Sequence, residues 1–183
     1  MTRHILVSAL FIVSLFALSG CSGAGPDAGL LSYTSKIPTD KINTELLKVT
    51  PIKRRSTFGS FAITRAVIHP AANDNRVALV TKFGLTTFEI PEGVDGTLAA
   101  SCGLRYDPDT KQIFLTDIRP GAIQFGNASL SKYVSKSTRK AIGSIVSKVF
   151  GDIPIHQMDS SFTAKFVKKV AVYKGNIVIV YGL

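Results

Sequence analysis

Residues 77–88 read VALVTKFGLTTF, a run rich in β-branched and aromatic residues. Such residues fit the pleated, half-buried surface of a sheet, so the run predicts a long strand. Comparable segments lie at 61–68, 94–106 and 113–118. Turn-forming residues separate these segments, at 73–75, 91–93 and 107–111. Strands joined in this way pair as antiparallel neighbours, so the middle of the chain predicts a meander.

The sequence pattern changes after this region. Residues 130–150 carry apolar side chains at helical spacing, among them Val134, Ile142, Ile145 and Val149. They predict the longest helix of the chain, with Ser129 as its N-cap. Before it, Arg119-Pro120-Gly121 is expected to interrupt the strand that begins at residue 113, and residues 122–125 either lie outside the strand or continue it after a bulge or bend.

Shorter elements are expected on both sides of this region. They are a strand at 31–37, a helix that starts at Thr39 as N-cap and stops before Pro51, a short helix from 160 or 161 to 170, a turn at 174–176 and a strand at 177–181. The basic run 53–55 is expected to lie in a loop. Because the helices are segregated from the run of strands, the predicted fold class is α+β.

The N-terminus has the features of a targeting segment. One positive residue, Arg3, precedes the apolar run 5–18, which is too short to cross ~30 Å of hydrocarbon as a helix. The tetrad Leu18-Ser19-Gly20-Cys21 resembles the lipobox of bacterial lipoproteins. This resemblance implies cleavage before Cys21 and lipidation of that cysteine, with two or three acyl chains giving stable membrane anchoring.

The predicted organisation follows from this signal. Residues 1–20 are a lipoprotein signal peptide, residues 21–31 a flexible Gly- and Ala-rich tether, and residues 32–183 a single domain. An ordinary secretory signal is the alternative, because Ala17-Leu18-Ser19 also fits a small-x-small cleavage site. Ser22 follows the cysteine where Asp would stand in an inner-membrane lipoprotein. By resemblance to Gram-negative lipoproteins, the domain is therefore expected on the outer membrane, facing the periplasm.

The charge of the chain is strongly positive. Twenty-two Lys and Arg oppose twelve Asp and Glu, for a formal charge of +10. Such a charge is typical of proteins that bind nucleic acid. The expected periplasmic location argues against that partner and leaves envelope polyanions such as lipid head groups. Alternatively, the basic residues are spread over solvated faces. The run Lys53-Arg54-Arg55 is the candidate contact with an anionic surface.

Several segments carry a resemblance to the YceB-like family of bacterial lipoproteins, whose function is unknown. They are Tyr33-Thr34, Ile42-Asn43 with Leu46, Ala66-Val67-Ile68, Ile113–Asp117 after the hairpin of Asp107 and Lys111, and Gly175–Ile179. The sequence departs from the family near Val180, where a proline is usual, and its second helical region is shorter. The family resembles the tubular lipid-binding (TULIP) superfamily. That resemblance implies a curved antiparallel β-sheet wrapped around one long amphipathic α-helix.

A fold of this kind implies an apolar groove between the sheet and the long helix. The candidate ligand-binding residues are Phe83, Leu85, Phe114, Val134, Ile142, Ile145 and Val149. The predicted function is an outer-membrane-anchored lipoprotein that binds a lipid or another apolar ligand. The alternative is an envelope scaffold or interaction protein that uses its basic surface.

The sequence offers no catalytic constellation and no motif for a metal or cofactor. Cys102 lies in an apolar stretch and is expected to be a buried small hydrophobe, because no imidazole is near it in sequence to activate a thiolate. His69 and His156 are expected to be structural or surface residues. We therefore predict a protein that is not an enzyme, with no cofactor and no metal.

Overall fold

The computed structural model describes residues 32–56, 59–88, 90–126, 134–158 and 162–182. These residues form two antiparallel sheets, two α-helices and a short 3-10 helix. In chain order the elements are β1 (Ser32–Ile37), α1 (Thr39–Val49), β2 (Ile52–Ser56), β3 (Gly59–Pro70), β4 (Val77–Thr87), β5 (Val94–Asp107), β6 (Gln112–Phe125), α3 (Lys136–Asp152), β7 (Pro154–Gln157), η2 (Phe162–Phe166), β8 (Val167–Tyr173) and β9 (Asn176–Gly182). The α+β class is confirmed, and strand dominates it.

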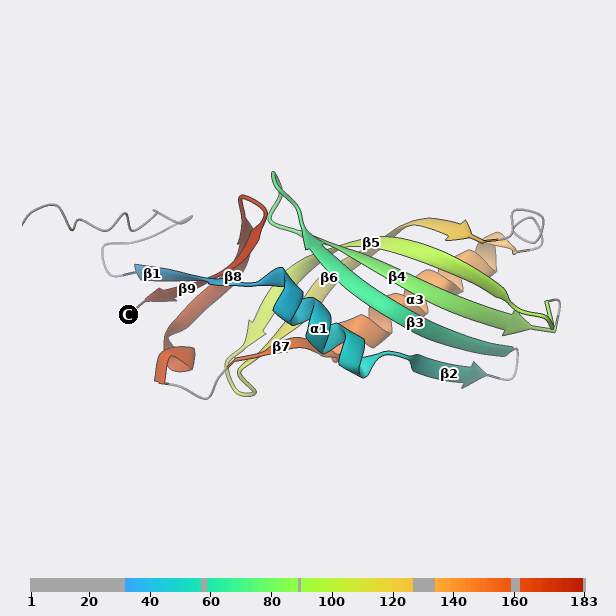
Figure 1. Ribbon diagram of the computed structural model, residues 1–183, viewed down its shortest axis with the longest axis horizontal. Coiled ribbons are helices and arrows are strands. Elements are labelled where there is room, and N and C mark those ends of the chain that lie inside the picture. Colours follow the sequence, from blue (N-terminus) through green and yellow to red (C-terminus); the bar gives the residue numbers. More distant parts are fainter. Residues whose placement is uncertain (1–31, 57–58, 89, 127–133, 159–161, 183) are drawn as a thin grey trace, which may run out of the picture.

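The larger sheet is a six-stranded antiparallel meander in the order β2-β3-β4-β5-β6-β7. It curls into a half-barrel whose long strands extend to the right in Figure 1, with α3 behind them. The smaller sheet, in the order β1-β9-β8, lies at the other end of the molecule. The four strands expected from residues 61–118 are confirmed as β3 to β6.

Alternation along β4 shows how the sequence fixes the inner face of the half-barrel. Every second residue from Val77 to Leu85 is buried, including Leu79, Thr81 and Phe83, while the residues between them are more exposed. Side chains on a strand alternate between its two faces, so these five share the concave face. The buried residues of β3 and β5 line up with them in register and complete one apolar interior.

The segment 119–121 does not end the strand, which continues past it with bulge-like irregularities, the alternative that the sequence left open. β6 continues from Gln112 to Phe125, and Pro120 pairs with Ala100 of β5. The irregularity appears as two shifts in the register between β5 and β6, at Leu98/Ala100 and Ser101/Gly103. Proline is tolerated here because β7 pairs only with the first residues of β6, which leaves the rest of that edge without a partner strand among the described residues.

Helix α1 closes one end of the curled sheet. Its Asn43 side chain is hydrogen-bonded to the main chain of Ile68, in the part of β3 that is not paired with β2. Its Glu45 carboxylate lies 3.1 Å from the Nδ1 of His156 in β7. These strands stand near opposite edges of the sheet, so the helix bridges the seam between them. Pro38, not Thr39, is the N-cap residue, and it makes no side-chain cap.

Helix α3 occupies the other end of the seam. It has 17 residues and begins at Lys136, with the Ser135 side chain accepting a hydrogen bond from the N–H of Thr138. The start expected at residue 130 is therefore too early, and Ser129 lies outside the described residues. Gly143 brings the helix close to β6, since a Cβ there would come 3.0 Å from Pro120. The helix thus lies against a half-barrel and is not a longer helix enclosed by the sheet.

Two further expectations are wrong. Residues 53–55 do not form a loop but belong to β2, which pairs with β3. The short helix expected up to residue 170 is a 3-10 helix that ends at Phe166, after which β8 begins and pairs with β9. In both cases pairing with the next strand along the chain determines the local structure.

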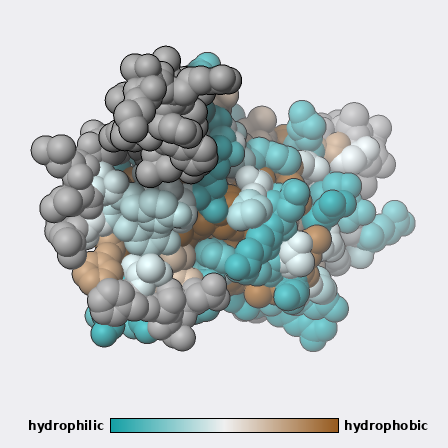
Figure 2. Space-filling model, turned by 60° about the vertical axis from the view of Figure 1, so that its left-hand side comes forward, coloured by the Kyte–Doolittle hydropathy of each residue, from teal (hydrophilic) through white to brown (hydrophobic). Residues whose placement is uncertain are grey.

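The apolar side chains gather in one core that spans both sheets. On the face drawn in Figure 2, hydrophilic side chains cover most of the described surface, and apolar ones show mainly in a recess between them. Among the described residues, the exposed large apolar side chains are Tyr33, Leu47, Val49 and Phe88, of which Phe88 is the most exposed at 83%. Within the described ranges, no helix is both long and apolar enough to cross a membrane. The expected signal peptide (residues 1–20), the expected tether (residues 21–31) and the expected lipidation site Cys21 lie outside those ranges.

Candidate functional site

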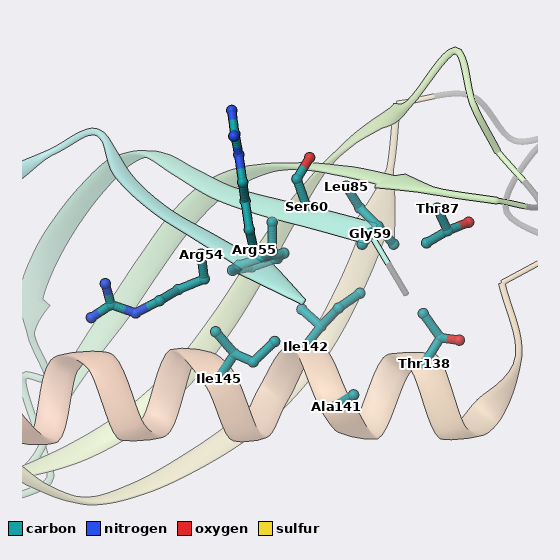
Figure 3. Close-up of a pocket in the computed structure, with 11 residues that line it drawn as sticks. Arg54, Arg55, Gly59, Ser60, Leu85, Thr87, Thr138, Ala141, Ile142 and Ile145 are labelled. Carbon is teal, nitrogen blue, oxygen red and sulfur yellow. The ribbon is translucent and has the colours of Figure 1, made fainter. Parts of the chain in front are cut away.

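The site with the best match to the sequence hypothesis is a groove at the end of the seam that α3 occupies. It lies between the helix and the neighbouring ends of β2, β3 and β4, and its volume is about 280 Å³. Figure 3 shows Ile142 and Ile145 on α3 facing these strands, with Ala141 and Thr138 farther toward the start of the helix. The lining residues are Arg54, Arg55, Gly59, Ser60, Phe61, Leu85, Thr87, Thr138, Ala141, Ile142 and Ile145.

The sheet side of the groove is built by strand register. Phe61 of β3 is directly opposite Leu85 of β4, and both side chains are buried on the concave face. On the helix side, Ile142 and Ile145 lie three residues apart, so both are on the face that meets the sheet. Ile142 is buried, and Ile145 is partly exposed. The walls are therefore mainly apolar, and Ile145 and the exposed Ala141 leave part of the helix wall accessible.

Arg54 brings a positive charge to the inner face of β2. It is opposite Phe61 in register and lies two residues from the buried Ile52, so its side chain is on the same face as both. Figure 3 shows it extending away from Leu85 and Ile142, past Ile145 at one end of the groove. Its Nη1 donates a long hydrogen bond of 3.5 Å to the carbonyl of Lys53. No carboxylate among the described residues pairs with it.

The neighbouring basic residues have a different orientation. Lys53 and Arg55 flank Arg54, so strand alternation places their side chains on the outer face of the sheet. Figure 3 shows Arg55 pointing away from α3, although the residue contributes to the rim of the groove. Lys53 does not line it. Only the middle residue of the expected basic run faces the apolar walls.

The structure divides the candidate apolar residues into three groups. Leu85, Ile142 and Ile145 line the groove, as expected. Phe83, Val134 and Val149 are buried in the core and do not line it. Phe114 lies on the outer face of β6, where the guanidinium of Arg105 stands 4.8 Å from its ring centroid.

Phe83 shows why a buried aromatic residue is not a ligand contact. Its ring lies between those of Phe61 and Phe125, at centroid distances of 5.3 and 6.0 Å. It also covers Gly96 on β5, the residue with which it pairs across the strands. The ring therefore fills space inside the sheet and does not line this groove.

Sequence reasoning missed Phe61, Thr138 and Ala141 as lining residues. A usable signal existed for Phe61, because it begins the alternating pattern of β3 and belongs to the same inner face as Ile63. Nothing local signals Thr138 or Ala141. They reach the groove because the start of α3 lies next to the end of the β2–β3 hairpin.

The other chemically interesting groups are structural. Cys102 is fully buried, and burial raises the pKa of its thiol to about 11. His156 is buried against Glu45, and His69 is exposed on β3. Arg76 is bonded to Ser101 and Asp117. Within the part of the chain that the structure describes, no three His, Cys, Asp or Glu residues gather as metal ligands would.

No protein-family model matches this chain, and no curated protein matches it.

Proposed function

We propose that this protein binds a lipid or another apolar ligand in the groove between the β2–β4 strand ends and α3. The observation that carries the proposal is the groove itself: a space of about 280 Å³ with mainly apolar walls that remains open beside a compact core. Ligand sites are typically concave and apolar with a few polar groups. Ser60, Thr87 and Thr138 supply such groups around this groove.

The sequence supplies the cellular setting of the proposal. Lipidation at Cys21 would hold the domain on the outer membrane, facing the periplasm, where acyl ligands are abundant. The resemblance to the YceB-like family and to TULIP proteins supports the same function, since a curved sheet beside a helix is the arrangement that leaves a groove. In this proposal the protein is not an enzyme and needs no cofactor.

A bulky side chain at the groove tests this function. Ala141 is exposed on α3 and lines the groove, so Ala141→Trp would fill the space without entering the core. Ser144 is also exposed on α3 but does not line the groove, which makes Ser144→Trp the matched control. We expect binding of the uncharged apolar dye phenylnaphthylamine to be lost in the first variant and kept in the second. Equal binding by both variants would contradict the proposal.

A second experiment asks what the protein carries in cells. The protein is expressed in cells with Cys21→Ser so that it carries no anchor, purified without detergent, extracted with organic solvent and analysed by mass spectrometry. We expect an acyl-containing compound that is depleted from Ala141→Trp and retained by Ser144→Trp. The anchor is checked separately by labelling cells with radioactive palmitate, which should label the parent protein and not Cys21→Ser.

An interaction protein of the envelope is the second candidate. Lys53 and Arg55 favour it, because they are exposed on the outer face of β2 and available to a polyanion or an acidic protein. Lys53→Glu with Arg55→Glu would abolish capture of such a partner, and Lys53→Glu alone, which does not touch the groove, would leave binding of the dye unchanged. Loss of dye binding with partner capture intact would favour the groove instead.

A further inference from the structure

The groove combines two properties that together specify its ligand more narrowly. Its walls are apolar, contributed by Phe61, Leu85 and Ile142, and the Arg54 side chain lines it and extends past Ile145 at one end. In the described part of the chain, Arg76, Arg105 and Arg119 each have a carboxylate within ion-pair distance. Arg54 has instead a single long bond to a main-chain carbonyl.

The position of Arg54 matters as much as its charge. Its cross-strand partner Phe61 is 4% exposed, so the base of the arginine side chain lies beside buried apolar surface while the guanidinium is exposed. A guanidinium in such a place can bind a carboxylate or phosphate through two parallel hydrogen bonds. An apolar chain attached to that anion would then lie along the wall formed by Phe61 and Leu85.

The volume of the groove limits the number of acyl chains that a bound ligand can place in it. A group the size of a water molecule occupies roughly 30 Å³, and a methylene is similar in size. A groove of about 280 Å³ therefore holds about nine such groups, which is most of one medium-length acyl chain and much less than the two long chains of a phospholipid.

Resting on the proposed function, we propose that the ligand is a single-chain anionic amphiphile whose head group binds Arg54 and whose chain fills the groove between β3, β4 and Ile142 of α3. The recognised chemistry is a carboxylate or a phosphate on one acyl or alkyl chain. Free fatty acids and single-chain phospholipids both provide it, and the test separates the two head groups.

The test compares ligands that share a chain and differ in the head group. The protein is the processed chain that the lipobox predicts, residues 21–183, with Cys21→Ser so that no acyl chain of its own competes. Dodecanoate, dodecyl phosphate, dodecanol and dodecyltrimethylammonium each displace phenylnaphthylamine below their micelle concentrations. We expect at least one anionic ligand to bind about tenfold more tightly than dodecanol, and the cation to bind most weakly. The better of the two anions identifies the head group.

Variants of β2 test the role of Arg54 with a control from the same strand. Arg54→Gln should weaken the anionic ligand about five- to tenfold and leave dodecanol unchanged. Lys53→Gln removes the same charge from the outer face of the strand, does not touch the groove and should have little effect. Arg54→Lys should restore part of the affinity. An equal loss in Lys53→Gln and Arg54→Gln would show a general effect of net charge and would overturn the assignment to Arg54.

The length of the chain tests the single-chain limit. Affinity should rise about fourfold for each added methylene and level off near nine or ten carbons, where the apolar walls end. A two-chain phosphatidic acid with chains of the same length should bind no more tightly than dodecyl phosphate. Clearly tighter binding of the two-chain lipid would overturn the single-chain proposal.

The outcomes separate this inference from the proposed function. If dodecanol and the anions bind equally and Arg54→Gln changes nothing, the groove binds apolar ligands but the anionic head group is wrong. If none of the ligands displaces the dye, or if Ala141→Trp leaves their binding intact, the groove function itself is wrong and the inference fails with it.

Discussion

The side chain of Asn43 in α1 forms two hydrogen bonds with the main chain of Ile68 in β3. Its Nδ2 donates to the Ile68 carbonyl at 3.2 Å, and its Oδ1 accepts from the Ile68 N–H at 2.7 Å. Pairing between β2 and β3 ends at Ile63. The amide thus provides the donor and acceptor that a neighbouring strand would have provided, which lets a helix continue the edge of the sheet.

Asn43→Ala should destabilise the protein by about 1–3 kcal/mol, because it removes both bonds and leaves the main-chain groups of Ile68 without this partner. Urea unfolding measures the change. Thr44→Ala is the control, since its exposed hydroxyl bonds only the Asp40 carbonyl within the same helix, and it should change stability by less than about 0.5 kcal/mol. Equal losses in the two variants would show that the amide has no special role.

A second prediction concerns Gly96, which the Phe83 ring covers. A Cβ at this position would overlap the ring and come 2.9 Å from the Gln124 carbonyl. Gly96→Ala should therefore destabilise by about 1–3 kcal/mol through overpacking. Gly151 in α3 has nothing within 4 Å of an added Cβ, so Gly151→Ala should be neutral or stabilising by up to about 1 kcal/mol. Thermal unfolding of the two variants and the parent protein measures these changes. An equal effect of the two substitutions would contradict the prediction for Gly96.

The strands of the meander were predictable because their signal is local. β4 buries every second residue, and turn-forming residues stand at its ends, so alternation and turn chemistry agree. β2 gives no such signal, since three of its five residues are basic. It becomes a strand because β3, the next strand along the chain, offers it a partner, and the residues of β2 themselves carry no signal of that pairing.

Two competing local patterns explain the error after residue 160. Phe162, Phe166 and Val170 have helical spacing, yet the segment VKKVAVY also favours a strand. Pairing of β8 with β9 favours the strand, and the helical pattern survives only as η2.

The groove was predictable only in part, because Leu85 and Ile142 could be assigned to inner faces from their patterns. That Arg54 joins them depends on the register of β2 with β3.

Arg76 is predicted to hold the irregular part of β5 and β6 together. Its guanidinium donates to the Ser101 hydroxyl and carbonyl at 2.5 and 2.8 Å, and to the Asp117 carbonyl and carboxylate, both at 2.7 Å. A lysine cannot reproduce this planar arrangement of hydrogen bonds, so Arg76→Lys should lower the free energy of unfolding by about 1–3 kcal/mol, measured in urea. Arg119 also bonds Asp117 but is mostly exposed, so Arg119→Lys should cost less than about 1 kcal/mol.

The pH dependence of the Arg76→Lys effect follows from Asp117. Hydrogen bonds from Arg119 and then Arg76 lower the pKa of this carboxyl below its usual value. A lowered pKa stabilises the folded state above the usual aspartate pKa of about 4, and this contribution is lost as the pH falls further. The stability difference between parent and Arg76→Lys should therefore shrink in acid. It should not vanish, because the bonds to Ser101 and to the Asp117 carbonyl do not titrate.

Cys102 is predicted to be an unreactive thiol. Burial raises its pKa from 9.0 to about 11, so at pH 8 the thiolate is about a hundredfold scarcer than in the unfolded chain. In a protein carrying Cys21→Ser, iodoacetamide should label Cys102 far more slowly under native conditions than in urea, as measured by mass spectrometry. Stability should also fall as the pH rises from about 9 to about 11, because the unfolded thiol ionises first in that window. Cys102→Ala has no thiol to ionise and should decline less over the same range. Rapid native labelling, or an identical decline in the alanine variant, would contradict the assignment of Cys102 as a neutral core residue.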